Sequence, residues 1–368
     1  MCAFIFIFVK NYRKMNIGDR IRELRIERGF SQDELALRSN FSKSYIQKFE
    51  DGQREIKSSQ LAQLSEALSI DISDIISPLK YISNEFVIKN IEFREVHKLE
   101  MDASYFEKKI LGFLYKRYSA YTRLEKIVNE NIIFQNPLKN FGAISRNEDV
   151  EVATKILRKK WKFENTPIYD LISFLEDLGI KIFEVSEDED FVGFSCFVKS
   201  NPIIVINARS ADISRRRFTV LHELAHLLLV FGETEKKENI EHFCNQFAGA
   251  MLLPEEILKS YVSTTISITL EELKRIKGKY GISILAILVR MVNVRLISWD
   301  KYNQWKEQYN SWTDKESDYS GREKVGRFNY LLAKGLREGL LSKDLASEIS
   351  DIPISKLNND PVNKEFLF

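Results

Sequence analysis

The chain has 368 residues, of which 44% are hydrophobic and 12% aromatic, which allows two or three domains with apolar cores and excludes a disordered chain. The formal net charge is only +2, so charge alone neither favours nor excludes a nucleic-acid partner. Three cysteines, Cys2, Cys196 and Cys244, are far apart in the sequence, which excludes a disulfide framework and predicts a reducing, cytoplasmic location.

The first 15 residues are interpreted as a tail. They begin with an apolar stretch, 1–9, that is too short to span a bilayer and lacks the basic start and small-residue cleavage site of a signal peptide. Met15 stands just before a strong helical pattern, so the protein starts at either Met1 or Met15. No other stretch approaches membrane length, and we expect no membrane partner.

Residues 16–78 show a compact, all-helical pattern. Ser31 with Glu34 three residues later predicts a capping box at the start of a second helix, and Asn40 suits a left-handed turn after it. Ser42 is expected to cap a third helix. The apolar positions that define the helices are Ile17, Ile21, Leu24, Leu35, Ala36, Ile46, Phe49, Leu61, Leu64 and Leu68.

Turn, caps and core positions agree in two stretches of this segment, Gly29-Phe-Ser-Gln-Asp-Glu-Leu-Ala and Phe41-Ser-Lys-Ser-Tyr-Ile-Gln-Lys-Phe-Glu-Asp-Gly. They resemble the Xre family of phage-repressor-like helix-turn-helix domains. The resemblance implies that the third helix enters the DNA major groove and that Gln32 and Arg54 lie against phosphates. The residues expected to face the bases are Lys43, Ser44, Gln47 and Lys48.

The charge of this domain leaves an alternative open. Residues 16–78 carry nine basic and eleven acidic residues, so non-specific DNA affinity is expected to be modest and salt-sensitive. The alternative is a helix-turn-helix domain that only binds a protein or mediates dimerisation.

The rest of the chain divides into a helical connector (79–150), a domain in which helices and strands alternate (151–300) and a C-terminal helical region (301–368). The connector contains one extended stretch at 86–93 and an aromatic-rich helix near 101–130. Further expected elements are helices at 152–161 and 168–178, strands at 181–185, 191–198 and 203–206, a hairpin turn at 200–202, and helices from about 214 and about 238. The predicted fold is α+β and predominantly helical, with a small β-sheet.

The strongest chemical signal is the run His222-Glu223-Leu224-Ala225-His226, which holds two of the four histidines. Histidines at i and i+4 lie on one face of a helix, so both imidazoles can bind one metal ion, and zinc is favoured. Glu223 lies beside that face and can reach a metal-bound water as a general base. The alternative is a buried helix with coincidental histidines.

A catalytic zinc normally takes a third protein ligand, and the next predicted helix offers one. Glu241 and Asn245 share a face at i and i+4, so Glu241 is the expected ligand and Asn245 the group that orients the site through hydrogen bonds. His242 is the alternative ligand. Cys244 would be a soft ligand, but its place on the helix suits a small buried residue better.

Two longer stretches contain these residues: Arg217-Phe-Thr-Val-Leu-His-Glu-Leu-Ala-His-Leu-Leu-Leu and Glu241-x-x-Cys-Asn-x-Phe-Ala-Gly-Ala-Met-Leu-Leu-Pro. With smaller pieces such as Phe191-x-Gly-Phe-Ser, they resemble the ImmA/IrrE family of metallopeptidases over most of residues 86–300. Cys244 replaces the alanine usual in the family. The resemblance implies a zincin-like domain with one Zn²⁺ per chain that cleaves a repressor protein.

Together these observations predict a DNA-binding regulator, expected to dimerise, with zinc-dependent endopeptidase activity on a repressor or other regulatory protein. One alternative is a regulator whose metal domain only senses a signal or binds a partner, and another is an antitoxin-like DNA-binding protein.

Three weaker features are also open to two interpretations. The strand 193–198 could pair with substrate backbone or simply belong to the core. Arg290 or Tyr280 could assist the oxyanion or lie on a helix surface. The run 215–217 of three arginines is expected to be a solvated or salt-bridged helix start.

Overall fold

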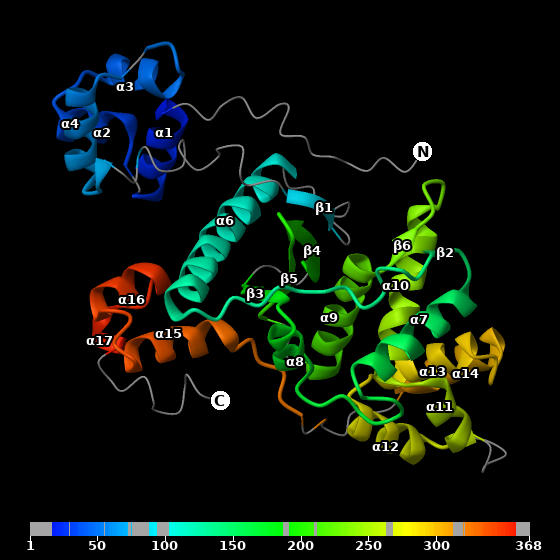
Figure 1. Ribbon diagram of the computed structural model, residues 1–368. Coiled ribbons are helices and arrows are strands. Elements are labelled where there is room, and N and C mark those ends of the chain that lie inside the picture. The colour runs from blue at the N-terminus through cyan, green and yellow to red at the C-terminus, as the bar shows by residue number, and fades with distance from the viewer. Residues whose placement is uncertain are drawn as a thin grey trace. The chain divides into compact units, whose positions relative to one another are not determined.

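The computed structural model describes residues 17–28, 30–54, 56–72, 75, 88–93, 103–186, 191–209, 212–262, 268–311, 319 and 321–357 (Figure 1). The chain divides into two compact units near residue 88. The fold is α+β and mostly helical, as predicted. The finer domain boundaries at residues 151 and 301 stay predictions. None of the described helices combines the length and hydrophobicity that crossing a bilayer requires.

The smaller unit contains the helices α1 (Ile17–Glu27), α2 (Gln32–Ser39), α3 (Lys43–Glu50) and α4 (Ser58–Leu68). The predicted capping box is present, because the Ser31 hydroxyl accepts from the Glu34 N–H and the Glu34 carboxylate accepts from the Ser31 N–H. Asn40 ends α2 in the left-handed conformation, with φ 56°. All ten predicted apolar positions lie in or against one core.

The larger unit contains a four-stranded sheet with the strand order β1-β4-β5-β3. These strands are β1 (Ile88–Phe93), β3 (Lys181–Val185), β4 (Gly193–Val198) and β5 (Asn201–Asn207). β5 pairs antiparallel with β4 and parallel with β3, which confirms the predicted hairpin. Its turn lies slightly earlier than predicted, because Lys199 takes the left-handed conformation while Asn201 and Pro202 already belong to β5. A second sheet pairs β2 (Ala143–Ile144) with β6 (Val230–Phe231).

The helices of the larger unit lie beside the larger sheet or pack on one another further from it (Figure 1). They are α6 (Ala103–Val128), α7 (Asn147–Lys160), α8 (Leu171–Asp177), α9 (Ile213–Leu228), α10 (Lys237–Leu252), α11 (Glu255–Val262), α12 (Leu270–Tyr280), α13 (Ile284–Asn293), α14 (Trp299–Ser311), α15 (Arg327–Arg337), α16 (Lys343–Ser350) and α17 (Ile354–Leu357). α9 packs on β4 and β5 on one side and on α10 on the other, and α10 packs against α7. The helix that carries the histidine pair is therefore held between the sheet and its partner helix.

The start of α9 is anchored by a buried arginine: of the two expected forms, solvated or salt-bridged, Arg217 takes the salt-bridged one. Its side chain is fully buried, and its guanidinium donates to the carbonyls of Ile168 and Gly281 at 2.7 and 3.1 Å. It also pairs with the Glu323 carboxylate and donates to the Tyr319 hydroxyl at 3.0 Å. Gly281 has φ +62°, and a Cβ there would lie 2.6 Å from the Arg217 Nε, so this position requires glycine.

The C-terminal helices attach to the same unit through buried carboxylates. Glu323 accepts from the backbone N–H of Ile172 at 3.0 Å, in the first turn of α8. Glu176, near the end of α8, accepts from the N–H groups of Gly326 and Arg327 at the start of α15. Burial raises the pKa of Glu176 to about 7. Two glutamates thus tie the chain after residue 319 to α8.

Candidate metal centre and nucleic-acid interface

α9 places two histidines and a glutamate on its buried side. Asp212 caps the helix by accepting from the N–H groups of Ser214 and Arg215 at 2.8 and 3.3 Å. The apolar residues of α9 pack into the main core, which leaves His222 and Glu223 almost fully buried. Burying such polar groups is costly unless they have partners. The partners come from α10 and β4.

Three side chains from α9 and α10 converge on one point. Glu241 Oε2 lies 3.2 Å from His222 Nε2, and Glu241 Oε1 lies 3.5 Å from His226 Nε2. The two Nε2 atoms are 3.1 Å apart. Tetrahedral zinc ligands at bond lengths of about 2.0–2.1 Å lie about 3.3 Å from one another. The spacing and the donor set of two imidazoles and one carboxylate therefore fit a zinc ion with one open coordination position.

Neighbouring side chains orient both imidazoles. His222 Nδ1 lies 2.9 Å from Asn245 Oδ1, so it can donate there and leave Nε2 as the lone-pair nitrogen. His226 Nδ1 lies 3.6 Å from the sulfur of Cys244. Cys244 is buried, and burial raises the pKa of its thiol, which disfavours the thiolate that binds metal.

The alternative third ligand, His242, is not in this cluster. Among the described residues, one group of three His, Cys, Asp or Glu side chains has converging ligand atoms, and it consists of His222, His226 and Glu241. His242 is exposed. The assignment of these three residues as zinc ligands stays a prediction, but their ligand atoms lie close enough together to bind one metal ion.

The predicted general base, Glu223, accepts a hydrogen bond from a residue that was not predicted from the sequence. The hydroxyl of Ser195, in β4, lies 3.0 Å from Glu223 Oε2, and both side chains are buried. Ser195 belongs to the stretch Phe191-x-Gly-Phe-Ser, but no local pattern relates it to α9, because 28 residues separate it from Glu223.

Arg290, one of the two residues considered for the oxyanion, has another role. Arg290 and Tyr280 are both buried, so their interpretation as helix-surface residues is wrong. The guanidinium of Arg290 pairs with Glu151 at 2.6 Å and donates to the Leu253 carbonyl at 3.1 Å, which ties α13 to α7 and to the end of α10. The Arg290 guanidinium therefore stabilises the packing of these helices.

β4 has no unpaired edge among the described strands, because it lies between β1 and β5. Of the two interpretations of residues 193–198, pairing with substrate backbone therefore requires β1 to move away first. β4 is a core strand in this arrangement.

In the smaller unit, the four side chains expected to face DNA bases share the exposed side of α3. They are Lys43, Ser44, Gln47 and Lys48, and the opposite side buries Ile46 and Phe49. Lys43 Nζ makes an exposed ion pair with Asp33 at 2.7 Å, which is weak enough for a phosphate or a base to compete with it. The base contacts themselves stay predictions.

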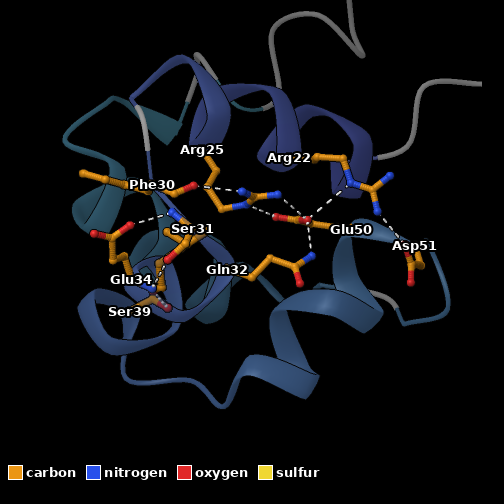
Figure 2. Close-up of polar contacts among 10 residues, drawn as sticks. Arg22, Arg25, Phe30, Ser31, Gln32, Glu34, Ser39, Glu50 and Asp51 are labelled. Atoms are coloured by element: carbon orange, nitrogen blue, oxygen red, sulfur yellow. Dashed lines mark hydrogen bonds and ion pairs between the residues drawn. The ribbon is translucent and has the colours of Figure 1, made fainter.

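Gln32, expected against phosphates, bonds within the domain (Figure 2). Its Nε2 donates to Glu50 at 2.8 Å, and Arg25 donates to both oxygens of the same carboxylate. Burial alone would raise the pKa of Glu50, but the bonds from Arg25, Gln32 and Arg22 lower it. The Gln32 amide keeps a second N–H, so a phosphate contact is compatible with this cluster. The Arg54 guanidinium lies 4.2 Å from the Tyr45 ring centroid.

Both units of the chain match families of known proteins. Residues 21–75 match the helix-turn-helix family, and residues 175–292 match the IrrE N-terminal-like domain family. The uncharacterized HTH-type transcriptional regulator y4dJ of Sinorhizobium fredii is 32% identical over 62 residues, which are 17% of this chain and 80% of that protein. The chain belongs to the helix-turn-helix regulators and carries an IrrE-like domain.

Two solved structures are similar to part of this helix-turn-helix regulator. The restriction-modification controller protein C.AhdI from Aeromonas hydrophila is 35% identical, with a TM-score of 0.17, over 17% of this chain and 94% of that one. The clp gene regulator ClgR from C. glutamicum is 27% identical, with a TM-score of 0.18, over 19% of this chain and 91% of that one.

The metal prediction for this IrrE-like regulator is direct. The purified protein is expected to carry about one zinc per chain, and His222→Ala or His226→Ala to lose it, because two ligands hold zinc much less tightly than three. The measurement is elemental analysis after gel filtration. His242→Ala is the matched control and should keep its zinc, whereas full zinc in both α9 variants would contradict the site.

Proposed function

We propose that this helix-turn-helix regulator is a zinc-dependent endopeptidase that binds DNA and cleaves a repressor or other regulatory protein. The observation that supports the peptidase activity is the group of three ligand side chains: the two imidazole nitrogens are 3.1 Å apart, and each lies 3.2 or 3.5 Å from one oxygen of Glu241. The buried carboxylate of Glu223 lies on the same helix as the two histidines. A purely structural zinc would normally have four protein ligands and no adjacent acid.

In the proposed reaction, His222, His226 and Glu241 hold the metal. Zinc, when bound, lowers the pKa of water and polarises a carbonyl group. Glu223 accepts the proton of the attacking water and later passes it to the leaving amine. Asn245 holds His222 in one tautomer, so that Nε2 keeps its lone pair toward the metal.

The test of peptidase activity uses two kinds of substrate, a peptide library and intact repressor proteins. The zinc-loaded protein is incubated with a peptide library made from a bacterial proteome and, separately, with the repressors encoded near its gene, and products are identified by mass spectrometry. Cleavage that a zinc chelator abolishes and added zinc restores supports the proposal. Intact peptides and repressors in the presence of stoichiometric zinc would overturn it.

A second candidate is a regulator whose metal domain only senses a signal or binds a partner. The pairing of β1 along β4 favours it, because no described edge of β4 is open to an extended substrate. The same cleavage test separates the two functions.

The DNA-binding part of the proposal places α3 in the major groove of an operator, with a dimer spanning two half-sites. Lys43→Ala and Gln47→Ala are each expected to weaken binding to the preferred sequence by about 1–3 kcal/mol, because exposed α3 side chains read base edges. Binding sites selected from random DNA with the wild-type protein supply the probe for affinity measurements.

The matched control is Gln63→Ala, which removes an exposed glutamine from α4 and should leave affinity unchanged. Zinc content should be the same in all three variants. Wild-type affinity in the Lys43→Ala and Gln47→Ala proteins would contradict the assignment of α3 as the recognition helix.

A further inference from the structure

A buried hydrogen bond joins β4 to α9, the helix that carries the histidine pair. Ser195 and Glu223 are each about 1% exposed, and the hydroxyl of Ser195 lies 3.0 Å from Glu223 Oε2. The serine hydroxyl donates and the carboxylate oxygen accepts in this hydrogen bond. A hydrogen bond to a charged acceptor in a buried site is stronger than one between neutral groups.

The strand lies close enough for this bond because of a glycine two residues before the serine. Gly193 and Ser195 point to the same face of β4, since side chains alternate along a strand. A Cβ at Gly193 would lie 2.8 Å from the Val205 carbonyl oxygen, 3.2 Å from Thr219 Cγ2 and 3.8 Å from Glu223 Cγ. The missing side chain therefore lets β4 approach the turn of α9 that carries Glu223.

We propose that Ser195 is a positioning residue for the general base, an inference that rests on the proposed peptidase function. Glu223 has three rotatable side-chain bonds, and proton transfer requires one arrangement relative to the attacking water. A bond from a rigid β-strand fixes Oε2 and leaves the other carboxylate oxygen as the proton acceptor. Ser195 acts through Glu223 and is not expected to touch the substrate.

The experiment compares Ser195→Ala with Ser195→Thr, which keeps the hydroxyl and has high strand propensity. The zinc-loaded Ser195→Ala protein should show a kcat about tenfold lower with an unchanged KM, as expected for loss of one hydrogen bond that orients a catalytic group. Ser195→Thr should restore most of the rate. Both variants should keep wild-type zinc content, which shows that the fold and the metal site are intact.

Two controls separate positioning from general destabilisation. Ser350→Ala removes another buried serine hydroxyl, which donates to the Ala346 carbonyl at 2.7 Å, and should leave kcat unchanged. In a Glu223→Gln background, Ser195→Ala should not lower the residual rate further, because the residue through which it acts is already disabled.

A readout independent of activity uses thermal unfolding of the zinc-free protein. The Tm losses of Ser195→Ala and Glu223→Ala should be non-additive by at least about 2 °C, because each change removes the same bond. Wild-type kcat in Ser195→Ala, or an equal fold loss in the Glu223→Gln background, overturns the positioning role and leaves the proposed function standing. A wild-type protein without cleavage activity overturns the proposed function and the positioning role of Ser195 together, while non-additive Tm losses would still support the bond.

Discussion

Replacing Glu223 by glutamine is expected to reduce peptide cleavage about a hundredfold or more and to leave the zinc content unchanged. Glutamine keeps the size of the side chain and an oxygen that can accept from Ser195, but it cannot take a proton from water. Glu223 is not among the three ligand residues, so the metal should stay. The measurements are initial cleavage rates of a library-derived peptide and elemental analysis of the same preparation.

Glu241→Gln is the informative comparison. It is nearly isosteric as well, but it removes the charge of the predicted ligand. Its zinc content should therefore fall, while the cleavage rate per bound zinc should change less. DNA affinity should be unchanged in both variants. If cells that carry the Glu223→Gln protein regulate their target genes like the wild type, proteolysis is not the function and the metal domain is a binding or sensing module.

The second large effect concerns stability. Glu323→Ala is expected to lower the free energy of unfolding of the larger unit by about 3–5 kcal/mol, because it leaves the buried guanidinium of Arg217 without its carboxylate. The same change also removes the acceptor for the Ile172 N–H. Denaturant unfolding, followed by far-UV circular dichroism, measures the loss.

Glu348→Ala is the matched control, since it breaks an exposed pair with Arg123 at 2.8 Å and should cost less than about 1 kcal/mol. Replacing Arg217 by Met and Glu323 by Leu in one protein should recover part of the stability, because apolar side chains of similar volume remove the unpaired charge. Equal decreases in the free energy of unfolding in Glu323→Ala and Glu348→Ala would show that the buried pair stabilises the protein no more than the exposed one.

Local patterns were enough to predict the helix-turn-helix unit and the histidine pair. A capping box such as Ser31 with Glu34 is confined to one helical turn, and the i, i+4 spacing of His222 and His226 fixes a shared face without any knowledge of the fold. The convergence of Glu241 on the histidines could be anticipated because it follows on the next helix and agreed with a family resemblance.

Contacts between distant segments could not be predicted in this way. The bond between Ser195 and Glu223 depends on how closely β4 packs on α9, and a run of hydrophobic residues does not encode that distance. The charge of Arg217 suggested a solvated or salt-bridged helix start, but no local pattern indicates that its partner is Glu323, which lies 106 residues further on. Gln32 likewise bonds to a carboxylate 18 residues away, a contact within the domain that its position at a helix start did not indicate.

The distance in sequence between Arg217 and Glu323 has a consequence for synthesis of the chain. The arginine is made 106 residues before the carboxylate that pairs with it. At about 5–20 residues per second, roughly 5–20 s pass before Glu323 is added. Until then Arg217, which anchors the start of α9, lacks its buried partner. A chain that terminates early, or is cut before residue 323, would carry the histidine pair of α9 without the buried ion pair that anchors the start of that helix.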